Sequence, residues 1–449
     1  MPIVASSGVR RVVWFGRVPG IEAPSLPGIP MPAMDSFVEP EPSGPGATAR
    51  PASRWSQHIG AAAVSLLIAM ACFAASIPFG DFQMEATMMG KDYELMSLHP
   101  LRSVGPHPER FLSPLFAWLL GLSGPRYWLF SHGMLLLFLA LAQHLTWMKS
   151  RDRVWATAFT FGIAISATAA TYRGLVGYSD PLTFCLLALS IALLHRRVAF
   201  WVLLGLGLLN HGQNLFLWPW LVYERSRVAR LDWRDAVGAA VGIGIYFGAR
   251  TLLVSDAPTA GAGSFSGASL SIRWYLEHLD WPRAIDLWIL ILPGLAFCFG
   301  AQLVVLFWDV MGPRRRERWI ALSLLMVAIA AILVIAIDIY RFVALLTFVM
   351  LVAMHRRLLP TPRSRAVLVA TVLATLAIRQ PQIDLVSFLM QRMTESAMRG
   401  EVSPVLRGVL PTCWPAFVGY AAFLGVLAAV AAWALPRFRE DGVPARPSN

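Results

Sequence analysis

Long apolar runs recur along the chain from Ile59 to Leu435, and they constrain its fold more than any other feature. The runs lack the strict alternation of apolar and polar residues that strands of a membrane barrel would show. Because only helices and closed barrels satisfy the backbone in lipid, the runs predict membrane-spanning helices. The composition agrees, with 57% hydrophobic and 14% charged residues and a mean hydropathy of +0.59. Soluble domains carry about a quarter charged residues.

Short basic segments separate the apolar runs and set the expected topology, because positively charged loops stay on the cytoplasmic side of a membrane. When all six segments are placed there with the N-terminal region, the spans alternate consistently. The predicted fold class is therefore all-α, a polytopic membrane protein with about 10–13 transmembrane helices and interfacial helices in its outer loops. The six segments are residues 149–153, 195–197, 225–234, 314–318, 355–365 and 437–446.

The chain divides into three parts. Residues 1–54 are Pro-rich and of low complexity, which predicts a disordered cytoplasmic tail. This region lacks the apolar core of a cleavable signal peptide. Residues 55–435 form the expected transmembrane domain, and residues 436–449 form a cytoplasmic C-terminal tail.

The formal charge of +12 does not indicate nucleic-acid binding, because the basic residues lie between apolar runs where topology accounts for them. The cysteines lie far apart, without the spacing of a metal site or a disulfide framework. His99, His107 and Glu109 also lack the spacing of metal ligands. We therefore expect no metal site, and the sequence leaves any other cofactor open. The four cysteines are Cys72, Cys185, Cys298 and Cys413.

Several apolar segments are too short for an ordinary crossing of about 20 residues. Residues 198–210 and 215–223 predict a re-entrant hairpin or a distorted crossing, which is tolerated where it lines a cavity. Residues 111–122 contain Pro114 and predict a short interfacial helix. Residues 272–279 and 383–393 suit surface helices, with plain connections as the alternative.

Polar residues at the expected outer ends of the spans are the candidates for chemistry, since a charge at membrane depth is costly unless it is paired or faces water. Asp81 ends the first span, and Asp92 and Glu94 follow in the same loop. These three carboxylates are the candidate catalytic groups. The candidate substrate-binding residues are Arg110, Tyr172, Arg173, Asp180, His211, Asn214, Asp338 and Arg341.

Structural interpretations of some of these residues stay open. Asp180 precedes Pro181 and suits the start of a helix. Asp338 and Arg341 have the i, i+3 spacing of an ion pair. His211 and Asn214 suit a hydrogen-bonded turn between two apolar segments.

Four short motifs, in their order along the chain, resemble those of the multi-spanning glycosyltransferases of superfamily C. The resemblance covers residues 55 to 435. One departure is that Phe82 follows Asp81 where a second acidic residue would stand. Asp92 and Glu94 form an acidic pair further along, so the choice of base stays open. The motifs are Gly80-Asp81-Phe82 and residues 109–115, 178–182 and 338–342.

The resemblance implies a bacterial inner-membrane enzyme that moves a sugar from a polyprenyl-phosphate donor to an acceptor on the outer face, with inversion. A carboxylate such as Asp81 would take the proton of the acceptor hydroxyl. Arginine or histidine would stabilise the departing phosphate. The expected partners are the lipid-linked sugar donor and membrane lipids.

Two other functions remain open from the sequence. Broken spans and polar residues suit a transporter or flippase for a lipid-linked or polar substrate, which would expose polar groups at both faces. The missing adjacent acidic pair suits a non-catalytic protein of the same fold.

Overall fold

The computed structural model describes residues 54–79, 82–87, 89–101, 110–255, 298–335, 343–377 and 410–439. Within these ranges the chain is mostly helical, as the apolar runs predicted. The surface helices expected over residues 272–279 and 383–393 lie outside the described residues.

The first half of the chain contributes both short and long helices. They are α1 (Arg54–Ser76), η1 (Ile77–Phe79), α2 (Met89–Met96), α3 (Leu112–Leu119), η3 (Gly124–Arg126), α4 (Tyr127–Ser150), α5 (Arg153–Ile165), α6 (Ala167–Gly174), α7 (Asp180–Ala192), α8 (Arg197–Asn210), η4 (Gly212–Leu217), α9 (Trp218–Ser226) and α10 (Trp233–Ser255).

The second half adds further helices and a two-stranded ladder. They are η5 (Gly300–Gln302), α14 (Leu303–Met311), α15 (Arg315–Ile335), α17 (Leu346–Val352), the π-helical turn η6 (Ala353–Arg357), β1 (Leu358–Leu359), a helix over residues 362–377, α19 (Leu410–Trp433) and β2 (Arg437–Phe438). The strands β1 and β2 pair antiparallel, with Leu358 opposite Phe438.

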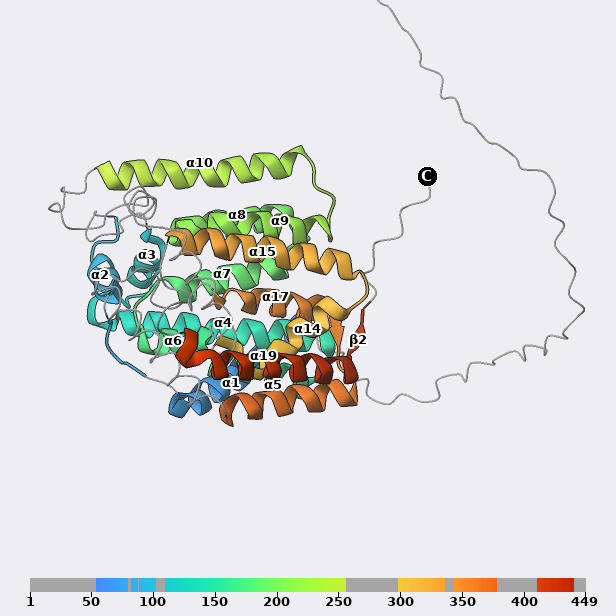
Figure 1. Cartoon of the computed structure of the whole chain (residues 1–449). Helices are drawn as coiled ribbons and strands as arrows, with labels where there is room; N and C mark the ends of the chain where they lie inside the picture. Colours follow the sequence, from blue (N-terminus) through green and yellow to red (C-terminus); the bar gives the residue numbers. More distant parts are fainter. Residues whose placement is uncertain are drawn as a thin grey trace, which may run out of the picture. The chain divides into compact units, whose positions relative to one another are not determined.

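The long helices lie side by side and give the described body two ends (Figure 1). Helix α1 packs on α4 and α5, α4 packs on α7, and α8 packs on both α7 and α10. The end that carries α2 and α3 is called the loop end; it comprises residues 82–87, 89–101, 110–126, 172–180 and 211–217. The end that carries β2 is called the basic end; it comprises residues 149–153, 193–197, 226–233, 312–315, 353–361 and 434–439.

Local sequence signals explain several helix boundaries at these ends. The Asp152 side chain accepts a hydrogen bond from the Trp155 amide at 2.9 Å and so caps the start of α5. Helix α7 has Pro181 in its first turn, where a proline loses no helical hydrogen bond. The expected hairpin is a helix, a 3-10 segment and a second helix: α8, η4 and α9, the last of nine residues.

Within the part of the chain that the structure describes, three helical segments are long and apolar enough to cross a membrane, namely Ile59–Ser76, Gly124–Ser150 and Trp233–Leu253. Helices α5 and α6 pass the same test together, but they bend by 45° at their junction. Large apolar side chains are exposed along α1 and α10. Examples are Leu67 at 64% and Leu252 at 74% exposure. These faces do not pack on the rest of the described body.

Candidate functional site

The sequence-predicted site residues that the structure describes gather at the loop end. Asp92 and Glu94 lie on α2, and Arg110 precedes α3. The others come from α6, from the start of α7 and from the turn after α8. These are Tyr172, Arg173, Asp180, His211 and Asn214. Asp81, Asp338 and Arg341 lie outside the described residues.

The loop that follows α1 lies along the segment that follows Arg173. The Gln83 amide donates to the Arg173 carbonyl at 3.0 Å, and the Thr87 amide donates to the Val176 carbonyl at 3.0 Å. The Thr87 hydroxyl donates to the Gly174 carbonyl at 3.1 Å. These bonds hold residues 82–87 against the cap between α6 and α7.

Helix α2 also contacts the cap between α6 and α7, through one glycine on each segment. A Cβ atom on Gly90 would lie 2.0 Å from the Val176 carbonyl oxygen, so no larger residue fits there without a shift of the backbone. Gly177 faces it with φ +93°, a conformation that favours glycine. The backbones of the two segments therefore meet directly, and this meeting fixes where α2 and its two carboxylates lie.

The carboxylates of α2 are half-buried and point in different directions. Residues two apart on a helix do not share a face, so Asp92 and Glu94 cannot both approach one small ligand. Tyr93 between them is buried, and its hydroxyl accepts a hydrogen bond from Arg110 Nη1 at 3.1 Å. The Arg110 guanidinium thus lies next to the helix that carries both carboxylates.

Arg173 is fully buried at the junction of α1, α5 and α6. Its Nη1 donates to the Ser76 hydroxyl at 2.6 Å and to the Ala164 carbonyl at 2.7 Å. Its Nη2 donates to the Ser76 carbonyl at 3.1 Å. These contacts give Arg173 a structural role in closing the end of α1.

The polar residues of the other turns are also buried or hydrogen-bonded within the protein. Asn214 Nδ2 donates to the Gly207 carbonyl at 2.7 Å, and the Asn214 amide donates to the His211 carbonyl at 2.9 Å. These bonds form the turn that was one interpretation of the pair. His211 and Asp180 are buried, with exposures of 4% and 7%. Asp180 lies in the first turn of α7, where the helix dipole stabilises a carboxylate.

Asn210 was not singled out from the sequence, yet it connects three elements at the loop end. Its Nδ2 donates to the Ser179 carbonyl at 2.7 Å and to the Thr183 hydroxyl at 2.8 Å. Its Oδ1 accepts from the Ser113 hydroxyl at 2.7 Å. A single asparagine in an apolar helix gives no sequence signal that distinguishes such a connector from an exposed residue.

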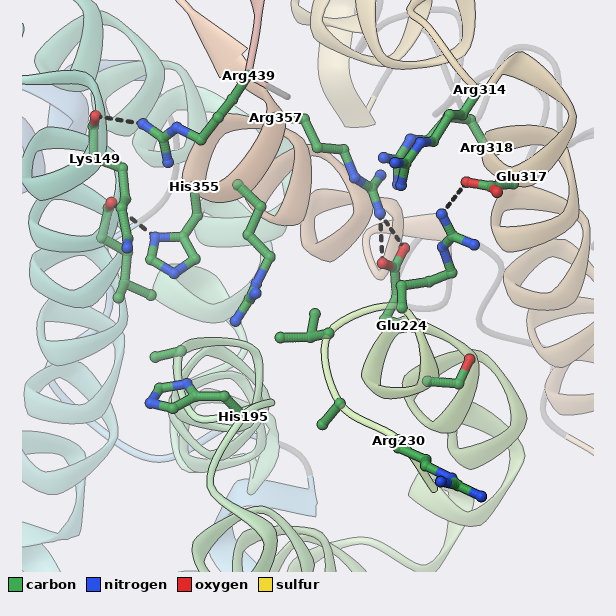
Figure 2. A pocket seen from close by; sticks show the side chains of 17 residues that line it. Lys149, His195, Glu224, Arg230, Arg314, Glu317, Arg318, His355, Arg357 and Arg439 are labelled. Carbon is green, nitrogen blue, oxygen red and sulfur yellow. Dashed lines mark hydrogen bonds and ion pairs between the residues drawn. The ribbon is translucent and has the colours of Figure 1, made fainter. Parts of the chain in front are cut away.

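The basic end contains a pocket of about 1140 Å³ (Figure 2). Each of the six basic segments of the sequence contributes to its wall, so the structure brings all six to one end. Ten residues of the lining are basic or histidine, and the two carboxylates are Glu224 and Glu317. The ten are Lys149, His195, Arg227, Arg230, Arg314, Arg318, His355, Arg356, Arg357 and Arg439.

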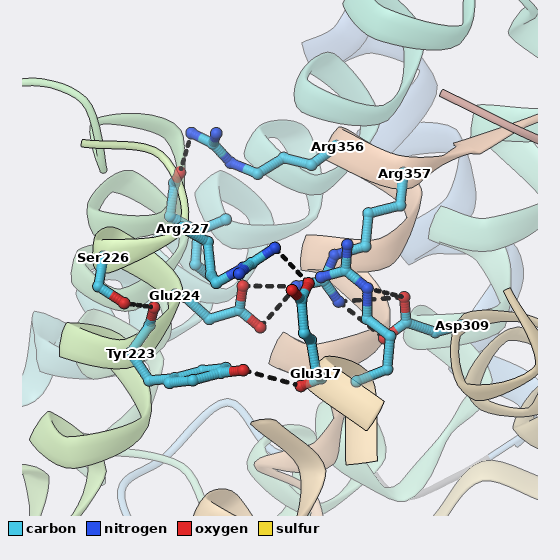
Figure 3. Close-up of polar contacts among 10 residues, drawn as sticks. Tyr223, Glu224, Ser226, Arg227, Asp309, Glu317, Arg356 and Arg357 are labelled. Carbon is cyan, nitrogen blue, oxygen red and sulfur yellow. Dashed lines mark hydrogen bonds and ion pairs between the residues drawn. The ribbon is translucent and has the colours of Figure 1, made fainter. Parts of the chain in front are cut away.

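Arg357 is the most deeply held cation of the pocket (Figure 3). Its Nη2 donates to Glu224 Oε1 at 2.6 Å, and its Nη1 donates to Asp309 Oδ2 at 2.7 Å. Burial alone would lower the pKa of Arg357, but Asp309 and Glu224 raise it overall. The ion pairs of Arg357 with Glu224 and Asp309 connect η6 with α9 and α14. Loss of one partner from such a buried network costs about 3–5 kcal/mol of stability.

Neighbouring cations of the pocket are oriented in two ways. Arg227 pairs with Glu317, whose backbone carbonyl also accepts a hydrogen bond from the Tyr223 hydroxyl at 3.2 Å. Arg439 Nη2 instead donates to the Lys149 carbonyl at 2.7 Å. Among the described residues, no carboxylate pairs with Lys149 or Arg439.

The pKa of His355 reflects its burial and the positive charges around it in the pocket. Its Nδ1 donates to the Leu145 carbonyl at 3.0 Å, because a carbonyl can only accept. The pKa of His355 is lowered to about 4, chiefly by burial; the hydrogen bond to the Leu145 carbonyl opposes this, and the charges of Arg356, Lys149 and Arg439 add to it. The pKa of the exposed His195 is also lowered, through partial burial and then the charges of Arg196, Arg356 and Lys149.

The pocket was missed from the sequence because the basic segments were interpreted as topology signals alone. Their shared end was predicted, but their convergence on one cavity depends on packing between helices far apart in the chain. Glu224, Asp309 and Glu317 were the available signal, since acidic residues beside arginine-rich loops indicate organised pairing. The described residues contain no group of three or more His, Cys, Asp or Glu placed to hold a metal ion.

Comparison with known proteins adds no identification: no family model, no curated protein and no solved structure matches the chain.

Proposed function

We propose that the described body is embedded in a membrane as a polytopic helical protein. Only 22% of the apolar stretch Ile59–Ser76 and 11% of Trp233–Leu253 is buried inside the protein. Soluble monomers rarely expose apolar surface over such lengths. Lipid would cover these faces. The basic end would then face the cytoplasm, and the loop end would face outward.

We further propose that the loop end is a glycosyltransferase site for a polyprenyl-phosphate sugar. The observation that carries this proposal is the placement of α2. Helix α2 carries two half-buried carboxylates and is docked over the α6–α7 cap, and the Arg110 guanidinium donates to its Tyr93 hydroxyl. Asp81 precedes the docked loop in the sequence. Such an arrangement supplies a base for an acceptor hydroxyl and a cation for a phosphate leaving group.

The proposed reaction is a single displacement. The acceptor oxygen forms a bond to the anomeric carbon as the bond from that carbon to the phosphate oxygen breaks. The hydroxyl proton passes to a carboxylate, for which Asp81 is preferred over Asp92 and Glu94. The electron pair of the broken bond stays on the polyprenyl phosphate, whose charge Arg110 would stabilise. The anomeric centre is inverted.

The test measures release of polyprenyl phosphate from a labelled polyprenyl-phosphate sugar by the purified protein. We expect Asp81→Asn to reduce the rate by roughly 10²–10⁴-fold, because a positioned general base contributes that much. Glu85→Gln, an exposed change in the same loop, is the matched control and should leave the rate unchanged. Full activity in Asp81→Asn would remove Asp81 as the base, and the same substitution at Asp92 would then test the next candidate.

One observation favours a transporter or flippase as the second candidate. A transporter needs polar surfaces at both faces, and the pocket at the basic end supplies the second one. Movement of a lipid-linked sugar across proteoliposomes, without release of polyprenyl phosphate, would support this function over the transferase. The absence of both activities with labelled donors would favour the non-catalytic protein.

A further inference from the structure

We propose that the pocket at the basic end binds a multiply charged phosphate group, such as a diphosphate. This site lies at the opposite end of the helices from the proposed transferase site, so it does not depend on that proposal. The pocket is lined by eight Lys or Arg residues against two carboxylates, and Asp309 also pairs with the lining residues Arg357 and Arg318, which leaves an excess of five positive charges among these described residues. A cavity with one dominant sign of charge concentrates ligands of the opposite sign.

The two carboxylates of the lining are already engaged. Glu224 is held by Arg357, and Glu317 is held by Arg227. These pairs hold Arg357 and Arg227 in place within the lining. The Arg357–Glu224 pair is buried and the Arg227–Glu317 pair is half-buried; because both are formed before a ligand arrives, binding requires little reorganisation of these four side chains.

Two cations are oriented without being neutralised by any described carboxylate. Arg439 donates to the Lys149 carbonyl, which is a neutral group and leaves the guanidinium charge in place. Lys149 follows on the same wall, beside His355 (Figure 2). A planar guanidinium and an ammonium on the same wall suit the oxygens of a phosphate.

The facing wall also carries cations, of which Arg357 pairs with Glu224 and Asp309, and Arg318 Nε lies 4.0 Å from Asp309 Oδ1. Arg314, Arg318 and Arg357 lie across the cavity from Lys149 and Arg439 (Figure 2). Arg314 has φ +62°, a left-handed conformation that glycine would adopt without strain. The chain instead places a guanidinium at this point of the pocket rim. Cations on two walls suit an anion with more than one charged group.

The size and access of the pocket agree with this ligand class. A volume of about 1140 Å³ exceeds what a single phosphate fills and leaves room for a diphosphate with an attached group. His195, Arg230 and Arg314 are exposed, so the cavity opens at the surface. The ligand is therefore either a free phosphate compound or the headgroup of an anionic lipid.

The experiment measures binding of inorganic pyrophosphate to the full-length protein in neutral detergent by calorimetry, at constant ionic strength. We expect saturable binding by the unmodified protein. The double variant Lys149→Gln/Arg439→Gln should raise the Kd at least about ten-fold, since it removes two charged donors. The control Arg315→Gln/Arg316→Gln removes the same charge from exposed positions outside the pocket lining and should change the Kd less than about two-fold.

A lipid arm separates the two sources of phosphate. The protein is placed in nanodiscs with neutral lipid alone or with added phosphatidic acid, and pyrophosphate is titrated into each. If phosphatidic acid weakens pyrophosphate binding to the unmodified protein but not to the pocket double variant, the pocket binds a lipid headgroup. Unchanged binding indicates a free phosphate compound.

Thermal unfolding of every variant, with and without pyrophosphate, keeps a folding defect distinct from a binding defect. Pyrophosphate should raise the melting temperature of the unmodified protein and of the control, but not of the pocket variant. Lack of saturable pyrophosphate binding by the unmodified protein in detergent, together with no lipid effect, would overturn the proposal. An equal loss of binding in the control would also overturn it, because the effect would then be general charge screening.

Discussion

At the scale of single residues, the surroundings of a group decide its chemistry more than its type does. His355 and His195 both belong to the basic end, yet His355 is buried and donates to a backbone carbonyl, whereas His195 is exposed. Arg173 and Arg439 carry the same charge, but the first closes the end of α1 and the second lies in an open pocket.

His355 predicts a pH dependence of stability. Its pKa in the folded protein is about 4, below the ordinary value of 6.5. The neutral form is therefore favoured by folding, and its contribution is complete above pH 6.5 and is lost as the pH falls toward 4. The loss is about 3 kcal/mol across this window. Thermal unfolding in detergent should show a steeper fall in melting temperature for the unmodified protein than for His355→Asn, which does not titrate. Parallel curves for the two proteins would contradict the assignment.

At the scale of elements, short segments at the loop end are placed by backbone contacts as well as by burial of large side chains such as Tyr93 and Met96. Residues 82–87 and α2 meet the α6–α7 cap through carbonyl and amide groups, and Gly90 and Gly177 permit the approach. The position of the two carboxylates on α2 therefore depends on residues that carry no functional group.

This dependence predicts that Gly90→Ala will weaken the contact between α2 and the α6–α7 cap and destabilise the protein. The added Cβ would lie 2.0 Å from the Val176 carbonyl oxygen, so α2 must move away from the cap. We expect destabilisation of about 1–3 kcal/mol, because overpacking of a close contact costs that much. Gly133→Ala, with open space around its added Cβ, is the control and should be neutral or slightly stabilising. Thermal unfolding of both variants measures this, and equal melting temperatures would show that α2 is not held here.

Sequence reasoning predicted the elements better than the sites. Apolar runs gave the helical class, and the short segments over residues 111–122 and 198–223 are short helices in the structure. The roles of Arg173 and Asn210 were not predictable, because each depends on partners about 30 to 100 residues away. Hydrophobic periodicity reports which segments are apolar, and it carries no information on which polar atoms meet after packing.

At the scale of the whole molecule, the helices sort charge between two ends. Segments from six parts of the chain bring basic residues to one pocket, while α2 and α3 occupy the other end. If a membrane separates the two ends, the distribution of charge sets the orientation of the protein, because basic loops remain on the cytoplasmic side.

Cysteine labelling tests this orientation. In a background without native cysteines, we expect Met84→Cys at the loop end to react with a membrane-impermeant maleimide in intact cells. Arg234→Cys, next to the basic end, should react only after the membrane is permeabilised. Both residues are exposed in the structure, so access to the reagent depends on the side of the membrane. Equal labelling of both positions in intact cells would contradict the proposed topology.

The pairing of β1 with β2 has a consequence for the order of synthesis. The Arg439 amide donates to the Arg357 carbonyl at 2.8 Å, and this places the Arg439 side chain in the pocket. Every other wall of the cavity is made by residues that leave the ribosome earlier. Because domains fold as they emerge from the N-terminal side, the earlier helices can assemble first. The cavity gains its last cation only when residue 439 has been added, so its completion is a late step in the maturation of the protein.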